Sequence, residues 1–501
     1  MKERNLRKTN IVCTIGPAVE NRMDELIKAG MSIARINFSH GDFEEQKDKI
    51  ERFFEIRKEL GLPVAVMLDT KGPEIRTALN KAGRDVKVQL KEGQKFTFFY
   101  EDRLGDEEGT SLSYKDLYKD VKPGNLILID DGKIQIRVDE IKDKDIIGTV
   151  LNDGGAGSRK SINVPGVSIK IPFLSPKDIN DLSNGARVGF DYVSASFVRN
   201  KEDVAEMRKV LDDNGGKDVK ILAKIENQEG IDNFEEILAA CDGIMVARGD
   251  MAVEVPFEEV PVVQKRFIKR CNEEGKLVIT ATQMLESMTN NPLPTRAEVS
   301  DVANAIYDRT GCIMLSGETA MGDYPLECVN TMVKVAKSVE PTINYWKRFT
   351  KKDWKIEEAD IESHAAYTTC VTARDIKADA IIDYTHTGNS ARRLAGYGAA
   401  CPIFAITDSE KVYSSVSTGV SPFKAEISEY IASLSTVNPV YADEVEKLRN
   451  IAKDNLSGVI TTNYDCFFEN IFDGYKTFVG QDELVFSQLQ GIAEIYKIHG
   501  S

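Results

Sequence analysis

A lysine and a glutamate interrupt the otherwise apolar start of the segment ILAKIENQEGI, residues 221–231. The run of residues 221–225 is typical of a strand that is buried on both faces. Because a strand directs alternate side chains to the same side, Lys224 and Glu226 would point to one place. Burying an ammonium and a carboxylate is costly unless they pair or bind an ion or ligand. The pair therefore marks a candidate functional site.

Polar side chains follow the other apolar segments in the same way. Glu226 and Asp250 end neighbouring segments, and two such carboxylates suit a hard divalent ion such as Mg²⁺. Lys224, Arg35 and Arg76 add positive charge, which suits a phosphoryl group in transfer. The other polar residues at segment ends are Asn37, Ser39, Asp69, Thr70, Lys71, Ser196, Arg248, Thr280, Thr282, Ser316 and Glu318. Any one of them could be a hydrogen-bonded core residue, but their convergence at segment ends indicates one shared site.

Alternating strand and helix patterns must position these residues. Residues 9–72 contain three strand patterns and residues 174–340 contain five, each followed by a helix. Eight such units predict a closed parallel (β/α)8 TIM barrel, in which the active site lies at the carboxyl ends of the strands. Between them, residues 74–173 show short alternating strands, which predict an inserted small β-barrel lid domain. The expected fold is α/β, with the barrel at 1–73 and 174–345, the lid at 74–173 and a C-terminal α/β domain at 355–426.

Composition limits the classes of function. The chain is 42% hydrophobic and 29% charged, as in soluble globular proteins, and its net charge of −15 argues against nucleic acid or anionic membranes as partners. No segment is apolar enough for a signal peptide or a membrane span, so we expect a cytoplasmic protein. The eight cysteines are scattered without a CxxC pair, which favours free thiols over a zinc site.

Several long motifs carry a resemblance to a known family. They are CTIGP, ARINFSHG, MLDTKGPEIRT, ILAKIENQEGI, IMVARGD, ATQMLESM, PTRAEVSDVANAI and LSGETAMGDYPLE. Through them, residues 9 to about 425 resemble the pyruvate kinases. The resemblance implies transfer of phosphate from phosphoenolpyruvate to ADP, which gives pyruvate and ATP, by a homotetramer that needs Mg²⁺ (or Mn²⁺) and K⁺. The inserted domain would close over the nucleotide as a lid.

The resemblance also implies roles for individual residues. Lys224 would stabilise the transferring phosphoryl group, and Thr282 would lie near the enolate carbon. The implied substrate contacts are Arg35, Lys224, Gly249, Asp250 and Thr282; the Mg²⁺ ligands are Glu226 and Asp250. The implied K⁺ ligands are Asn37, Ser39, Asp69 and Thr70, and the nucleotide contacts are Asn37, His40, Arg76 and Lys160.

Four residues can be compared with the pattern that is usual in the family. Met251 and Ala252 replace the usual Leu-Gly, and Ser161 replaces a glycine, so we expect altered kinetics. Glu74 stands where K⁺-dependent members carry glutamate. If its charge is uncompensated, the chain should need K⁺.

The C-terminal part departs from the family. The loop Thr385, Thr387, Gly388, Asn389 and Ser390 resembles the effector-phosphate loop of the regulatory domain, although Ser390 could instead simply cap the following helix. Residues 427–501 resemble part of a SIR2-like domain, in which Asn463, Asp465 and His499 occupy the NAD-chemistry positions. Because the glycine-rich nucleotide loop is absent, we expect no NAD-consuming activity there. In the family a loop from the far C-terminal part of the regulatory domain closes the effector site, and because that part is replaced here, we expect weak or no sugar-phosphate activation.

Two other functions are compatible with these patterns. A metal-dependent aldolase of pyruvate-type substrates also uses a barrel with a carboxylate-held Mg²⁺, but it would lack the inserted lid. A catalytically impaired pyruvate kinase-like fusion protein is the second alternative, and the intact site positions argue against it.

Overall fold

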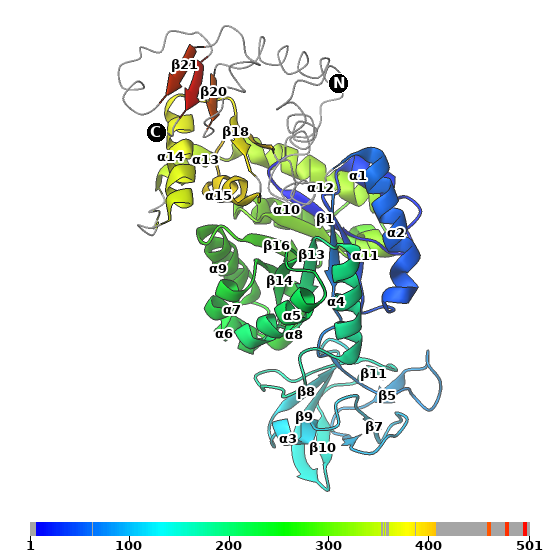
Figure 1. Cartoon of the computed structure of the whole chain (residues 1–501). Coiled ribbons are helices and arrows are strands. Elements are labelled where there is room, and N and C mark those ends of the chain that lie inside the picture. The colour runs from blue at the N-terminus through cyan, green and yellow to red at the C-terminus, as the bar shows by residue number, and fades with distance from the viewer. Residues whose placement is uncertain are drawn as a thin grey trace.

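The computed structural model describes residues 7–62, 64–351, 354, 356, 360–385 and 387–406, together with three later strands at 458–461, 476–479 and 494–497. Figure 1 shows the parts in a row, with the lid at one end, the barrel in the middle and the C-terminal elements at the other end. The positions Asn463, Asp465 and His499 lie outside the described residues, so the expectations for the tail stay predictions.

The barrel is closed by eight parallel strands, which confirms the count of three plus five. They are β1 (Asn10–Thr14), β2 (Ile33–Asn37), β3 (Ala65–Asp69), β13 (Tyr192–Ala195), β14 (Lys220–Ile225), β15 (Gly243–Ala247), β16 (Leu277–Ala281) and β17 (Cys312–Leu315). The order around the barrel is β1-β17-β16-β15-β14-β13-β3-β2. Neighbouring strand ends therefore converge on one mouth, as the polar pattern requires.

Helices surround this barrel. They are α1 (Met23–Ala29), α2 (Phe43–Leu60), α4 (Pro176–Val188), α5 (Lys201–Asp213), α6 (Gln228–Asp232), α7 (Phe234–Ala240), α8 (Arg248–Glu254), α9 (Val260–Glu273), α10 (Arg296–Tyr307), α11 (Gly317–Ala320) and α12 (Pro325–Val339), with 3₁₀ turns at Glu286–Thr289 and Glu340–Thr342. One apolar cluster fills the barrel interior, and a larger one lies between strands and helices. The two clusters follow from strands that are apolar on both faces.

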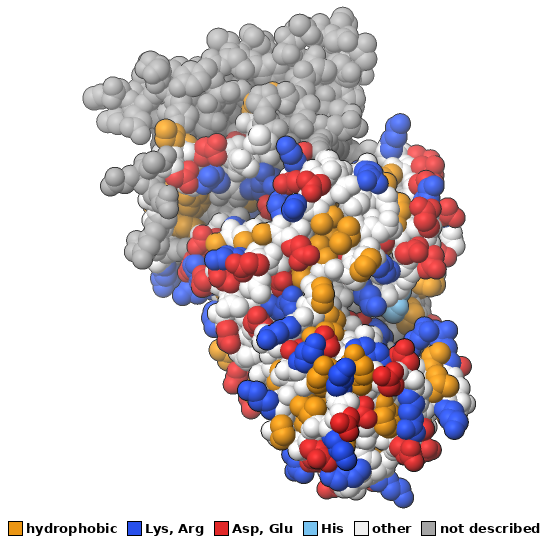
Figure 2. Space-filling view, turned by 60° about the horizontal axis from the view of Figure 1, so that its bottom comes forward, with side chains coloured by type: hydrophobic (Ala, Val, Ile, Leu, Met, Phe, Trp, Pro, Cys, Tyr) orange, Lys and Arg blue, Asp and Glu red, His pale blue; other side chains and the backbone are white. Residues whose placement is uncertain are grey.

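Residues inserted between β3 and α4 form the lid. Its elements are β4 (Ile75–Arg76), β5 (Val88–Leu90), β6 (Lys95–Phe99), β7 (Gly109–Ser111), α3 (Leu117–Asp120), β8 (Leu126–Ile129), β9 (Ile134–Lys142), β10 (Asp145–Val150), β11 (Gly154–Ala156) and β12 (Ser161–Asn163). Seven strands form one sheet in the order β4-β12-β8-β9-β10-β6-β7. Thr77 and Leu112, which directly follow the edge strands β4 and β7, form an isolated β-bridge. This bridge brings the two edges of the sheet together, so that the sheet resembles a small barrel. Over the described residues of the face in Figure 2, lysine and arginine side chains are interspersed with aspartate and glutamate.

The C-terminal elements lie beyond the amino-terminal side of the barrel. They are α13 (Tyr345–Lys351), α14 (Ile361–Asp375), β18 (Ile381–Tyr384), α15 (Asn389–Tyr397) and β19 (Ile403–Ile406), with β18 and β19 parallel. The later strands β20 (Gly458–Thr461), β21 (Lys476–Val479) and β22 (Glu494–Lys497) form a parallel sheet in the order β20-β22-β21, and β20 lies beside β18. No helix among the described residues is long and apolar enough to cross a membrane.

Candidate active site

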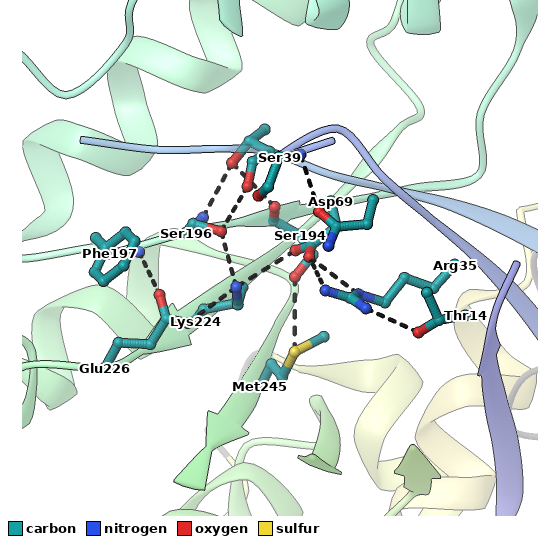
Figure 3. Close-up of polar contacts among 12 residues, drawn as sticks. Thr14, Arg35, Ser39, Asp69, Ser194, Ser196, Phe197, Lys224, Glu226 and Met245 are labelled. Atoms are coloured by element: carbon teal, nitrogen blue, oxygen red, sulfur yellow. Dashed lines mark hydrogen bonds and ion pairs between the residues drawn. The ribbon is translucent and has the colours of Figure 1, made fainter. Parts of the chain in front are cut away.

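Lys224 lies at the centre of a buried polar cluster at the barrel mouth (Figure 3). Its Nζ donates to Ser196 Oγ at 2.8 Å and lies 2.9 Å from Glu226 Oε1 and 3.6 Å from Asp69 Oδ1. Burial acts to lower the pKa of Lys224, but the charges of Asp69, Glu226 and Asp250 outweigh it and hold this pKa above its usual value. The buried lysine is therefore paired, as expected from the sequence, and its carboxylate partners favour its charged form.

Glu226 is a fully buried carboxylate. Its Oε2 accepts a 2.7 Å hydrogen bond from the backbone N–H of Phe197, a residue with a left-handed φ of 58°. Burial raises the pKa of Glu226 to about 8, against the opposing effect of Lys224, and the nearby charge of Asp250 adds to the rise. The carboxylates of Glu226 and Asp250 repel each other when both are charged. A divalent cation bound between them would relieve this repulsion.

The donor set around this pair also fits a hard cation. Among the described residues, no group of three or more His, Cys, Asp or Glu side chains is arranged to hold a metal. A divalent ion between Glu226 and Asp250 would thus take its other ligands from water or from substrate oxygens, as Mg²⁺ commonly does. Such a site is open to a phosphorylated substrate.

Asp69 and Arg35 form a second buried pair beside Lys224. Arg35 Nε donates to Asp69 Oδ2 at 3.0 Å, its Nη2 bonds the same oxygen, and its Nη1 donates to Thr14 Oγ1 at 2.8 Å. Burial favours the neutral form of Asp69, but Arg35 and Lys224 override it and lower the pKa of this carboxyl. Asp69 Oδ1 accepts no hydrogen bond from the described residues, and Lys224 Nζ, at 3.6 Å, is its nearest described ion-pair partner.

The other residues compared with K⁺ ligands lie near this pair. Asn37 ends β2, and its Oδ1 accepts the backbone N–H of Ser39 at 3.0 Å. Thr70 follows β3, and its Oγ1 accepts the N–H of Ser196 at 3.1 Å. Their oxygens, with Asp69 Oδ1, are the hard ligands that a monovalent cation prefers.

Gly249, Asp250 and Thr282 come from adjacent strand ends. Thr282 Oγ1 accepts the N–H of Gly249 at 2.8 Å and donates to the carbonyl of Ala281 at 2.7 Å. Asp250 is the next residue of α8 and is half-buried. The structure therefore brings these three residues together, as the sequence predicted.

Arg76 and Lys160 lie side by side on the lid, because β4 and β12 pair with Arg76 opposite Ser161. Arg76 Nε donates to Glu74 Oε2 at 2.8 Å, and Lys160 Nζ lies 3.2 Å from Asp130 Oδ1. The premise that the charge of Glu74 is uncompensated is therefore wrong. Arg76 neutralises it from two residues further along the same edge of the lid.

A cleft of about 360 Å³ separates the lid from the barrel. Its lining includes Glu74, Ser161, Phe197, Asp250 and Glu254. Asn163 of the lid donates to Glu254 Oε1 at 2.9 Å, which joins the lid to the same helix that carries Asp250. His40 is exposed in the loop after β2, and its carbonyl accepts a hydrogen bond from Gln46 at 2.6 Å.

The loop compared with an effector site follows β18. Gly388, with a left-handed φ of 75°, precedes α15, and its N–H donates to Thr385 Oγ1 at 2.9 Å. Ser390 does not cap the helix, as the alternative interpretation held, because it lies inside α15 and donates to Asp383 Oδ2 at 2.8 Å. Asn389 N–H donates to Thr387 Oγ1 at 3.4 Å.

Three contributors to the site had no assigned role in the sequence analysis. Thr14 supports Arg35, Ser196 accepts from Lys224, and the backbone of Phe197 holds Glu226. Thr14 ends a barrel strand and Ser196 follows one, so their positions at strand ends could have identified them as site residues. The Phe197 contact is made by the backbone, which side-chain types do not reveal.

Three protein-family models match parts of this chain. The family model described as pyruvate kinase, barrel domain, matches residues 6–329, and the pyruvate kinase, alpha/beta domain, matches 363–464, beyond the boundary expected near 426. A SIR2-like domain model matches residues 457–501.

Curated relatives cover most of the chain. A pyruvate kinase of Clostridium acetobutylicum is 48% identical over 90% of this chain and 95% of its own length. A pyruvate kinase of Clostridium perfringens is 45% identical over 90% of this chain and 93% of its own length. One of Sporosarcina psychrophila is 45% identical over 88% and 75%, respectively. With its barrel, lid and buried lysine–carboxylate cluster in place, the chain belongs to the pyruvate kinase family.

Proposed function

We propose that the chain transfers the phosphoryl group of phosphoenolpyruvate to ADP, giving pyruvate and ATP in glycolysis. The observation that carries this function is Lys224, a buried lysine at the barrel mouth that is paired with both Glu226 and Asp69. A fixed cation in a water-poor site stabilises negative charge that develops on phosphoryl oxygens.

The surrounding residues supply the remaining functions. Arg35 and the backbone at Gly249 would contact the substrate, and Thr282 would lie near the enolate carbon. Glu226 and Asp250 would hold Mg²⁺ or Mn²⁺, whose chemistry there is to offset negative charge on the phosphoryl oxygens. Asn37, His40, Arg76 and Lys160 would bind the nucleotide.

Both lid cations are already paired with carboxylates. Phosphates of ADP would therefore replace Glu74 and Asp130 as partners of Arg76 and Lys160. Until ADP binds, these two carboxylates would hold the side chains of Arg76 and Lys160 in a fixed orientation.

Activity should require K⁺, which we propose binds at Asn37, Ser39, Asp69 and Thr70. The reason is no longer Glu74, which Arg76 compensates, but the buried carboxylate oxygen Asp69 Oδ1, which accepts no hydrogen bond from the described residues. Turnover should fall at least about tenfold when K⁺ is replaced by tetramethylammonium, which is too large for ligands of this kind. Full turnover in the organic cation alone would contradict this assignment, and titration with K⁺ should restore activity to a saturating level.

The experiment that tests the function compares pyruvate formation from phosphoenolpyruvate with and without ADP. The kinase requires ADP for pyruvate release. A metal-dependent aldolase would ignore ADP and cleave a carbon–carbon bond instead, and an impaired fusion protein would give no product. We also propose, from the family resemblance, that the enzyme acts in the cytoplasm as a homotetramer.

A further inference from the structure

The turn that carries Thr282 has a strained backbone. Thr282 and Gln283 both adopt left-handed φ angles, of 66° and 53°. Non-glycine residues rarely adopt this conformation, and β-branched threonine is among the least suited to it. Two in succession must be held by their surroundings.

Arg248 is the residue that holds this turn. Its Nη2 donates to the carbonyl of Thr282 at 2.6 Å, and its Nε donates to the carbonyl of Ala281 at 3.1 Å. The guanidinium is largely buried, with 13% of its side chain exposed. A planar guanidinium can make both bonds at fixed relative angles, whereas an ammonium cannot.

Asp301, on α10, fixes the guanidinium from the opposite side. Its Oδ1 and Oδ2 lie 2.9 and 2.7 Å from Arg248 Nη1. The polar contacts of this side chain in the described part of the chain are with Arg248, and none is with the cluster around Lys224 or with the lid. Its contact with the site runs through Arg248.

The two residues after the strand β15 thus hold one threonine at two points. Arg248 binds the carbonyl of Thr282, while the N–H of Gly249 binds its hydroxyl at 2.8 Å. Because both contacts are made to Thr282, a shift of this turn after loss of the guanidinium would disturb both together.

We propose that Arg248 and Asp301 are positioning residues that set the place of Thr282 and Gly249 against phosphoenolpyruvate. This inference rests on the proposed function. Neither residue touches the reacting atoms. The pair presets the strained turn, so that the Thr282 hydroxyl meets the substrate without rearrangement.

A purely structural role for the pair makes a different prediction. It would lower stability and affect both substrates alike. The positioning role predicts a selective effect on phosphoenolpyruvate, because ADP is bound from the lid by Arg76 and Lys160, outside the reach of this turn.

The test measures KM for each substrate and kcat in the full-length protein. Asp301→Asn should lower kcat/KM for phosphoenolpyruvate about 10-fold, and Arg248→Lys about 100-fold, with KM for ADP within about twofold of wild type. Asp308→Asn is the matched control: Asp308 follows α10 and pairs with Lys265 at 2.6 Å, away from the turn. This control should leave both KM values unchanged.

A double-mutant cycle with Thr282→Ala shows whether the pair acts through Thr282. Once the hydroxyl is absent, Asp301→Asn should have less than about a threefold further effect. Equal loss of affinity for both substrates, or full additivity with Thr282→Ala, would overturn the proposal. If the wild type forms no pyruvate, the proposed function fails instead, and calorimetric binding of phosphoenolpyruvate to the same variants then decides the role of the pair.

Discussion

Lys224→Met should lower kcat at least about 10³-fold, the loss expected when a preorganised group that stabilises transition-state charge is removed. Lys224 Nζ lies within 3.6 Å of two carboxylates and donates to Ser196, and these contacts hold the ammonium in place. KM for ADP should change little, because Arg76 and Lys160 remain. Steady-state kinetics of pyruvate formation measure both quantities.

The same substitution should also destabilise the protein, which has to be separated from its effect on catalysis. It leaves Glu226 and Asp69 buried without their shared cation, and breaking a buried ion pair costs about 3–5 kcal/mol. The double variant Lys224→Met/Glu226→Gln removes one of those charges and should recover part of the stability but none of the turnover. A folded Lys224→Met protein that turns over within a few-fold of wild type would refute the assignment.

Glu226→Gln should weaken Mg²⁺ binding about 100-fold, because one of two carboxylate ligands is lost. In the metal-free protein, burial raises the pKa of Glu226 to about 8. Mg²⁺ needs the carboxylate form, so below pH 8 its binding should release a proton and should tighten as the pH rises. Isothermal titration in buffers of different ionisation enthalpy measures this release.

The controls for this prediction follow from the same pKa. Proton release should vanish in Glu226→Gln, whereas Glu229→Gln, which changes another cleft-lining carboxylate, should keep both the affinity and the release. Because the folded-state pKa is raised, Glu226 favours the folded metal-free protein below its unfolded pKa of about 4.5, and this contribution is lost as the pH rises through 8. Mg²⁺ affinity that does not change between pH 6 and 8 would contradict the account.

Much of the fold and site followed from the sequence because the signal was local. Segments such as 221–225 are apolar on both faces and short, which defines barrel strands. Once eight such strands close, topology brings their carboxyl ends together. Asp69, Asp250 and the Lys224–Glu226 pair therefore meet although they come from three different strands.

Contacts that depend on side-chain direction or on backbone conformation could not be predicted. The pairing of Glu74 with Arg76 requires that both point the same way from a lid edge, which alternation allows but does not demand. Serine is a common residue type at a helix N-cap, but α15 already begins at Asn389, so Ser390 lies inside the helix. Its hydroxyl donates to Asp383 instead. The left-handed turn at Thr282 carries no glycine to mark it, and Asp301 reaches it from a helix outside the strand-end pattern.

The central claim is that one site passes a phosphoryl group from phosphoenolpyruvate to ADP. Phosphorus-31 nuclear magnetic resonance follows this transfer directly, with the wild-type protein, phosphoenolpyruvate, ADP, Mg²⁺ and K⁺ in one sample. We expect the phosphoenolpyruvate signal to decline while the γ-phosphate signal of ATP rises in equal amount, and Lys224→Met to abolish both changes. Inorganic phosphate in place of ATP, or an unchanged phosphoenolpyruvate signal in the folded wild type, would contradict the account.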